Sequence, residues 1–392
     1  MRALRFAWRS LVRQPARAAL GIIGVAAVGA LLFDMLLLSE GLITSMRDLL
    51  DRTGYDVRVT TTAELPRTSP RLKEAASAVS QISGLPEVRT AIAIRFADVI
   101  LDRGDDEALN GTFQGVIGSS HPWTVLRGTD LSGDDIVVNE TLAAAMDLRP
   151  GSRLTINASC ESDADVLPPA QFRVAGVVSF PFELTGERTI GGSLETLDAA
   201  CGGNGSNEAD MLLVTSTGNA DGTAAAIGRV RPDLRAATNA QMIGRLEQGG
   251  FTYFQQISAV LTTVTVAFAL LLICVLLTVS VNQRLGEIAA LRALGFSRHR
   301  VVADVLSESA LIVGIGGLLS LPVGIVLAVW LDRILKRMPN IPADLHFFVF
   351  DPAALGLHLA LLAVTAFAAA IYPMTIVARL PIAATLRNEV IS

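Results

Sequence analysis

Four long stretches of the chain are apolar and almost free of charged side chains, and this feature limits the fold most. They cover residues 18–39, 257–281, 307–330 and 353–376. Each reaches the roughly 20 residues that a helix needs to cross the hydrocarbon core of a bilayer. Soluble domains contain about 25% charged residues, whereas this chain of 392 residues contains 18%. The sequence therefore predicts an α-helical membrane protein with four transmembrane helices.

A basic leader, residues 1–17, precedes the first apolar stretch. Its arginines Arg5, Arg9, Arg13 and Arg17 recur every four residues, which is typical of an amphipathic helix at a membrane surface. A cleavable signal peptide is the alternative interpretation. The apolar stretch continues past the length of a signal-peptide core, so we expect it to be retained as an anchor.

The distribution of arginine predicts the orientation. Residues 1–17 hold five arginines and no acid, and the loop of residues 282–303 is also rich in arginine. Short loops with excess positive charge stay in the cytoplasm. We therefore expect both termini and this loop to be cytoplasmic, and residues 40–256 to form a domain outside the membrane.

The segment of residues 40–256 predicts an α+β domain. Short β-branched segments with partial alternation indicate strands, and segments with helical patterns lie between them. Residues 111–181 are predicted to form a small inserted β subdomain, while residues 41–51 and 240–256 would extend the first two spans as stalk helices. Strands are predicted at residues 56–60, 95–101, 136–138, 153–156, 172–178 and 211–215, and helices at residues 69–82, 139–147, 221–230 and 239–247.

The three cysteines divide into two groups. Cys160 and Cys201 lie in loops of the polar domain, where a disulfide closing about 40 residues would contribute up to ~4 kcal/mol. Two unrelated thiols are the alternative. Cys274 lies in an apolar stretch, where packing is the expected role. The four histidines have no metal-site spacing, so no metal site is predicted.

The scarcity of lysine excludes nucleotide binding through a P-loop. That motif needs a lysine after glycine-rich backbone, and the two lysines of the chain, Lys73 and Lys336, follow Arg71-Leu72 and Ile334-Leu335. We expect a subunit that is not an enzyme, with no cofactor of its own and no nucleic-acid partner.

The loop after the second span has the sequence RLGEIAALRALGFSRHR over residues 284–300. It resembles the signature R-x-x-E-I-x-x-L-R-A-L-G of the FtsX-like permease family of ABC transporters. The tail RLPIAATLR is similar to the closing segment of that family, with Thr385 in place of the usual alanine. The polar domain resembles that of the MacB branch, although no ATPase domain is fused here. The matching residues are Arg284, Glu287, Ile288, Leu291, Arg292, Ala293, Leu294, Gly295 and Glu308.

The resemblance implies a permease subunit of a bacterial inner-membrane transporter, with an FtsX-like permease domain over residues 257–392. A separate cytoplasmic ATPase would bind ATP and Mg²⁺, and its closure would move the extracytoplasmic domain to export or extract a substrate. The permease would form a homodimer or a heterodimer in membrane lipid, with a periplasmic adaptor or an outer-membrane channel as further partners. The expected contacts with the ATPase are Arg284, Glu287, Arg292, Gly295 and Arg298.

Two other functions are kept as alternatives. The first is an FtsX-type regulator that uses ATPase motion to activate a cell-wall hydrolase. The second, from a different class, is a membrane-bound ligand receptor, although the cytoplasmic segments are too short to fold as an output domain.

Small residues recur every four positions in the third apolar stretch, at Gly316, Ser320, Gly324 and Ala328. Such a face lets helices approach closely in lipid, and it would lie either against the bundle of its own chain or against a second permease. Asp34 and His358 lie near the ends of their spans, where we expect both side chains at the membrane interface.

Overall fold

The computed structural model describes residues 12, 15–63, 69–102, 108–158, 169–201, 207–248, 250–283, 285–286, 288–289, 294, 297–338, 342 and 345–379. The chain divides into two compact units. We call one of them the helical unit; it comprises Met1–Thr44, Gly249–Leu335 and His346–Ser392. The other, here called the α+β domain, comprises Ser45–Gln248 and Lys336–Leu345.

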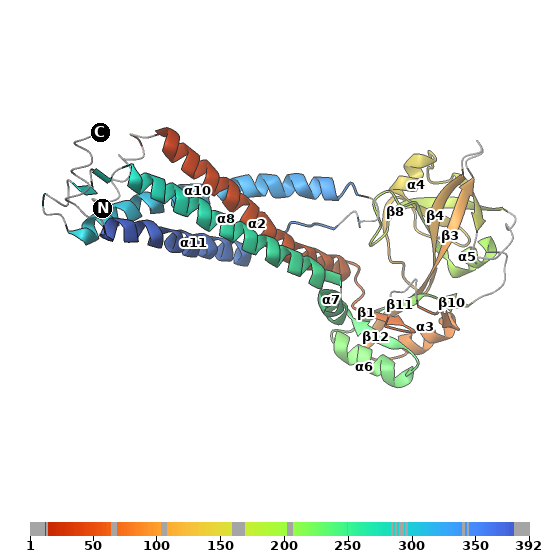
Figure 1. Cartoon of the computed structure of the whole chain (residues 1–392). Coiled ribbons are helices and arrows are strands. Elements are labelled where there is room, and N and C mark those ends of the chain that lie inside the picture. The colour runs from red at the N-terminus through yellow and green to blue at the C-terminus, as the bar shows by residue number, and fades with distance from the viewer. Residues whose placement is uncertain are drawn as a thin grey trace. The chain divides into compact units, whose positions relative to one another are not determined.

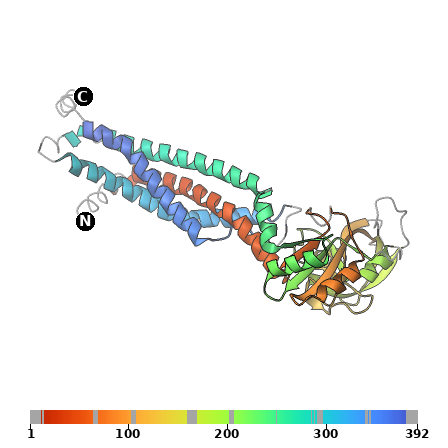
Figure 2. The same ribbon diagram turned by 90° about the horizontal axis from the view of Figure 1, so that it is seen from below.

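Four long helices make up the described part of the helical unit, and they lie side by side in Figures 1 and 2. All four are long and apolar enough to cross a membrane, which confirms the prediction of four spans. The helix α2 extends beyond its apolar part, so that its last turns belong to the α+β domain. The helices are α2 (Pro15–Arg52), α8 (Gly250–Asn282), α10 (Arg298–Leu335) and α11 (Pro352–Arg379).

Apolar side chains from all four helices meet inside this unit. One cluster joins Val25 of α2, Ile273 of α8, Val313 of α10 and Ala369 of α11. Because lipid is as apolar as these side chains, packing complementarity rather than escape from water holds such helices together.

One ten-stranded sheet forms the centre of the α+β domain. Its strand order is β12-β1-β11-β3-β4-β9-β6-β8-β5, and β7 pairs with both β3 and β8. The pairs β4–β9 and β6–β8 are parallel and the others antiparallel. The strands are β1 (Val57–Thr60), β3 (Val88–Asp102), β4 (Ala108–Ile117), β5 (Thr124–Gly128), β6 (Ile136–Asn139), β7 (Arg153–Ala158), β8 (Ala170–Ser179), β9 (Thr189–Ser193), β11 (Met211–Ser216) and β12 (Arg235–Thr238).

Short helices cover the sheet and bury its apolar side chains. Asn139, Ser193 and Asn219 each cap a helix by accepting a hydrogen bond from a backbone N–H three residues later. The mixed α and β composition of this domain, between the first and second spans, confirms the predicted fold class. The helices are α3 (Ala75–Ser83), α4 (Glu140–Ala145), α5 (Leu194–Ala200), α6 (Ala220–Val230) and α7 (Asn239–Gln248).

The helix predicted over residues 69–82 is wrong in its first half. Residues Leu72–Lys73 form the strand β2, which pairs with β10 (Glu208–Ala209). The helix α3 begins only at Ala75, because Glu74 has the left-handed backbone angle φ of 56°. Pairing with a strand that is distant in sequence here overrides the local helical pattern.

The predicted stalk segments have different forms. Residues 41–51 continue α2 without a break. The helices α7 and α8 are separate elements, and residue 249 between them lies outside the described residues.

Candidate functional site

The point where α2 ends and α7 begins, both within the α+β domain, is held by one buried amide. Asn239, the first residue of α7, is 6% exposed. Its Nδ2 donates hydrogen bonds to the carbonyl oxygen of Tyr55, at 3.1 Å, and to Oδ1 of Asp51 on α2, at 3.3 Å. Its backbone N–H donates to the carbonyl of Asp56 at 3.0 Å. The start of α7 therefore cannot move away from the end of α2 without breaking three hydrogen bonds. We call these four residues the α2–α7 junction.

Asp56 connects this junction to the sheet. Its Oδ1 accepts a hydrogen bond from the backbone N–H of Ser216 at 2.8 Å, and its Oδ2 accepts one from the Ser216 hydroxyl. Its own N–H donates to the carbonyl of Val214 at 3.1 Å. Val214 and Ser216 belong to β11, which lies between β1 and β3 in the sheet. The segment that follows α2 is therefore attached to an inner strand.

Tyr55, the residue before Asp56, contacts residues near β5 and β8. Its ring is buried in an apolar cluster with Trp123 and Phe180, and its hydroxyl hydrogen-bonds to Oγ of Ser120 at 3.1 Å. Burial raises the pKa of Tyr55, and the hydrogen bond to Ser120 opposes that shift. Ser120 belongs to the loop between β4 and β5, so this hydrogen bond links Tyr55 to that loop.

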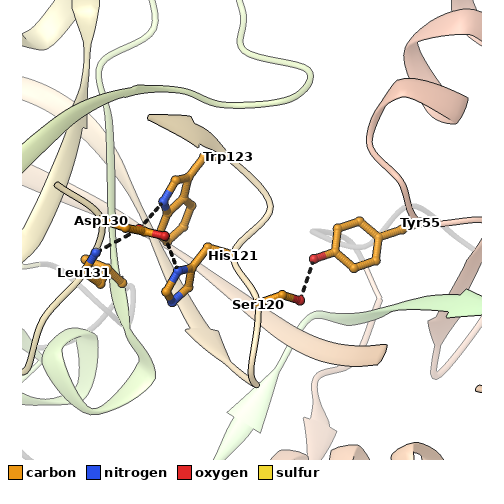
Figure 3. Close-up of polar contacts among 6 residues, drawn as sticks. All are labelled: Tyr55, Ser120, His121, Trp123, Asp130 and Leu131. Carbon is orange, nitrogen blue, oxygen red and sulfur yellow. Dashed lines mark hydrogen bonds and ion pairs between the residues drawn. The ribbon is translucent and has the colours of Figure 1, made fainter. Parts of the chain in front are cut away.

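The same loop is held by a polar cluster around Asp130 (Figure 3). Asp130 accepts hydrogen bonds from Nδ1 of His121 at 2.9 Å, from Nε1 of Trp123 at 3.0 Å and from the backbone N–H of Leu131 at 2.8 Å. The rings of His121 and Trp123 stack with centroids 4.9 Å apart. Partial burial acts to raise the pKa of Asp130, but these hydrogen bonds outweigh it and hold the pKa below its ordinary value.

A second point of contact involves the loop between β8 and β9. The guanidinium of Arg58 on β1 lies 5.1 Å from the ring centroid of Phe182, whose φ is 61°. Two residues further on, Leu184 forms a β-bridge with Pro342, and Oγ1 of Thr185 donates to the carbonyl of Lys336 at 3.2 Å. Burial lowers the pKa of Arg58 to about 10, so the side chain is still charged at neutral pH.

The segment between α10 and α11 therefore contacts the loop between β8 and β9. Lys336 and Pro342 lie in this segment, which belongs to the α+β domain. Three segments of the α+β domain that are linked to long helices thus make contacts within it: the end of α2, the helix α7 that precedes α8, and the α10–α11 connection. Such contacts can pass a displacement of these segments to the sheet.

The small-residue face of α10 lies against α2 in the helical unit. A Cβ atom added at Gly316 would lie 2.8 Å from Cβ of Val25. One added at Gly324 would lie 3.0 Å from the ring of Phe33, and Ala328 packs in a cluster with the same Phe33. Ser320 is fully buried and hydrogen-bonds to His358 at 3.0 Å. This face of α10 is used within the bundle of its own chain.

Most residues of the predicted ATPase contact lie outside the described residues. This applies to Arg284, Glu287, Arg292 and Gly295, whereas Arg298 marks the start of α10. Their role remains a prediction. Cys201 is disulfide-bonded and Cys274 is a free thiol. Cys160 also lies outside the described residues, so its pairing with Cys201 stays a prediction.

Sequence reasoning missed the α2–α7 junction and the contact between Arg58 and Phe182. The sequence predicts Asn239 only as the first residue of a helix, because asparagine is common at helix N-termini, where its side chain accepts a hydrogen bond from the backbone. Nothing in a single sequence shows that its amide reaches residues about 185 positions earlier.

Comparison with known proteins gives a family for the C-terminal part of the chain. Residues 259–382 match the family described as FtsX-like permease C-terminal. The matched range includes α10, α11 and the loop from which the ATPase contacts were predicted. Comparison with curated protein sequences finds no match.

Several solved structures are similar to this chain at low identity. The periplasmic region of MacB from Actinobacillus actinomycetemcomitans has 14% identity and a TM-score of 0.38, and covers 51% of this chain and 98% of that one. The extracellular domain of the noncanonic ABC-type transporter YknZ from Gram-positive bacteria has 12% identity and a TM-score of 0.33, covering 47% and 99%. A domain of a permease protein from Porphyromonas gingivalis has 12% identity and a TM-score of 0.29, covering 46% and 87%.

Proposed function

We propose that this chain is the membrane subunit of an ABC transporter that is driven by a separate cytoplasmic ATPase. The observation that carries the proposal is the family match over residues 259–382. This range contains Glu287, Arg292 and the other residues expected to contact the ATPase. ATP and Mg²⁺ bind to the partner, since neither lysine of the chain lies in a P-loop sequence.

The work of the transporter is done by the α+β domain. We place this domain on the extracytoplasmic side of a bacterial cell membrane, and both termini in the cytoplasm, because arginine is concentrated in the leader and in the loop of residues 282–303. A motion of the ATPase moves the spans, and the α2–α7 junction passes that motion to β11 through Asp56. The permease acts as a dimer and exports or extracts a substrate at the outer face, with or without an adaptor protein.

Co-purification tests this proposal. The tagged chain is extracted from its native membrane in mild detergent, and the proteins that accompany it are identified and counted. We expect one P-loop ATPase for each permease, and we expect Glu287→Gln with Arg292→Gln to abolish its retention. The matched control is Glu140→Gln with Arg127→Gln, an exposed ion pair of the α+β domain with its atoms 3.2 Å apart, which should retain the ATPase.

The outcomes separate the alternatives. If a third component with hydrolase activity co-purifies, the function is regulation of a cell-wall enzyme and not export. The absence of an ATPase in every detergent would refute the proposal and favour a ligand receptor.

A further inference from the structure

The two edges of the sheet in the α+β domain have different surroundings. The strand β12 lies at one edge and packs against α6 and α7, and its residues Ala237 and Thr238 are 5% and 2% exposed. The strand β5 lies at the other edge, and all five of its residues are exposed. Of the strands that the structure describes, only β8 pairs with β5. An edge strand presents a row of unpaired N–H and C=O groups, so β5 has a free side on which another strand can pair.

The exposed strand β5 carries apolar side chains. Val125 is 38% exposed and Leu126 is 47% exposed. Natural edge strands commonly prevent unwanted pairing with free charges. The single charged residue of β5 is Arg127, and its guanidinium lies 3.2 Å from the carboxylate of Glu140 on α4. The charge on this edge is therefore compensated, and the apolar side chains remain available for contact with a partner.

Contacts near both ends of β5 fix its position. Trp123 directly precedes the strand, and its Nε1 donates to Oδ1 of Asp130, two residues beyond the end of the strand, at 3.0 Å (Figure 3). At the end of the strand, Gly128 pairs with Gly176 of β8, and a Cβ added at Gly128 would lie 2.5 Å from the carbonyl oxygen of Ala175. Glycine permits this close approach. The edge is thus ordered before any partner binds, which reduces the entropic cost of binding.

A groove of about 520 Å³ adjoins this edge. Arg127 of β5 and Val177 of β8 line it, together with residues of α4 and of the turn that follows α4. Its most buried lining residues are apolar, since Ala143 is 5% exposed and Val177 is 1% exposed. Its charged residues are paired, because Arg127 contacts α4 as described and Arg149 lies 4.0 Å from Asp147. The groove therefore suits an apolar side chain and does not select a charged one.

An irregularity in β5 argues against a second copy of this chain as the occupant of the edge. The register between β5 and β8 shifts between Val125 and Arg127, so Leu126 is the extra residue of a β-bulge. A symmetric dimer would pair the two β5 strands around a two-fold axis. The two bulges would then lie opposite each other and interrupt the pairing, whereas a regular strand from another protein meets only one bulge.

We propose that β5 is a docking strand for an extended segment of a separate protein, which pairs with the free side of β5 and places an apolar side chain in the groove beside α4. The partner is a polypeptide, because a second backbone is what matches N–H and C=O groups at strand spacing. Apolar or β-branched residues of the segment would lie beside Val125 and Leu126. The inference goes beyond the proposed transport function and does not depend on an ATPase.

A synthetic strand tests the pairing on the wild-type full chain in lipid nanodiscs. The probe is the dye-labelled peptide Lys-Thr-Val-Thr-Val-Thr-Lys, and its binding is followed by fluorescence anisotropy with empty nanodiscs as the blank. The control peptide has the same side chains but a methyl group on every backbone nitrogen between the two lysines, so it has no donor on either edge. We expect it to bind at least about tenfold more weakly, because several hydrogen bonds are lost together. Equal affinities, or no binding of the unmethylated probe, would overturn the proposal.

Disulfide capture tests the location of the bound probe. In a chain with Cys274→Ser, Val125→Cys should form a disulfide with a probe in which one valine is replaced by cysteine. The matched control is Val230→Cys on α6, where the wild-type side chain is 46% exposed, and it should be captured much less. Equal capture at the two positions would refute the assignment of the site to β5.

The same chemistry tests the second copy as an occupant. Leu126→Cys, again with Cys274→Ser, is oxidised mildly in native membranes without the probe. We expect no disulfide-linked dimers at this position. Dimers linked through Leu126→Cys would show that β5 pairs with itself and would overturn the proposal of a separate partner.

Discussion

The contact between α10 and α2 can be tested by adding a single methyl group at Gly316. The new Cβ would lie 2.8 Å from Cβ of Val25, 2.9 Å from its Cγ1 and 3.0 Å from the carbonyl oxygen of Ile22. The Cβ atom of Val25 and the carbonyl oxygen of Ile22 are fixed to the backbone of α2, so they cannot move aside unless the helix moves. Overpacking of this kind costs about 1–3 kcal/mol. We therefore expect Gly316→Ala to destabilise the helical unit by about that amount.

Gly314 provides a matched control on the same helix. No atom lies within 4 Å of a Cβ added at Gly314, so Gly314→Ala should have little effect or should stabilise α10 slightly through helix propensity. The assay is thermal unfolding in detergent, followed by reaction of a fluorogenic maleimide with Cys274, which is a free thiol on α8. The expected order of melting temperatures is Gly314→Ala at or above wild type and Gly316→Ala several degrees below. Equal melting of the two variants would refute the close approach of α10 to α2.

Three further results are expected. Asn239→Ala should lower the unfolding free energy by about 1–3 kcal/mol, because buried polar atoms lose their partners, and hydrogen exchange should increase at residues 51–56; unchanged exchange there would contradict the junction. Cys201→Ser and Cys160→Ser should each cost up to ~4 kcal/mol and give the same shift on a non-reducing gel, whereas different shifts would exclude their pairing. The pKa of Asp130 is lowered in the folded state, so ionised Asp130 stabilises the domain at pH values above its ordinary pKa, and this contribution is lost as the pH falls through the pKa of the folded state. The unfolding free energies of Asp130→Asn and wild type, measured as a function of pH, should therefore converge on acidification. Parallel curves would contradict this.

The membrane spans and most strands follow from local patterns, and these could be predicted. The strand expected at residues 95–101 lies inside β3, and the one at residues 211–215 lies inside β11. Each has a buried β-branched core that is visible in a short window of sequence. The failure at residues 69–74 has the opposite origin, because β2 exists through its pairing with β10, about 135 residues later in the chain.

The positions of Asp34 and His358 illustrate a second limit of sequence reasoning. Distance from the end of a span favoured the membrane interface for both side chains. The structure instead places both at 0% exposure, because burial depends on which face of a helix meets its neighbours. The sequence of α2 has no hydrophobic periodicity that could identify its buried face, since nearly all positions of its apolar part are hydrophobic.

The polar contacts of the α+β domain explain how a helix displacement could reach distant parts of the sheet. A purely apolar junction would allow sliding, because dispersion contacts are weakly directional. Hydrogen bonds weaken steeply when their angle changes, so the contacts of Asn239 and Asp56 resist both rotation and translation. Tyr55 continues the path through its bond to Ser120, and the bonds to Asp130 restrain the loop that Ser120 occupies. The strand β11 and the β4–β5 loop should therefore move with the end of α2 as one body.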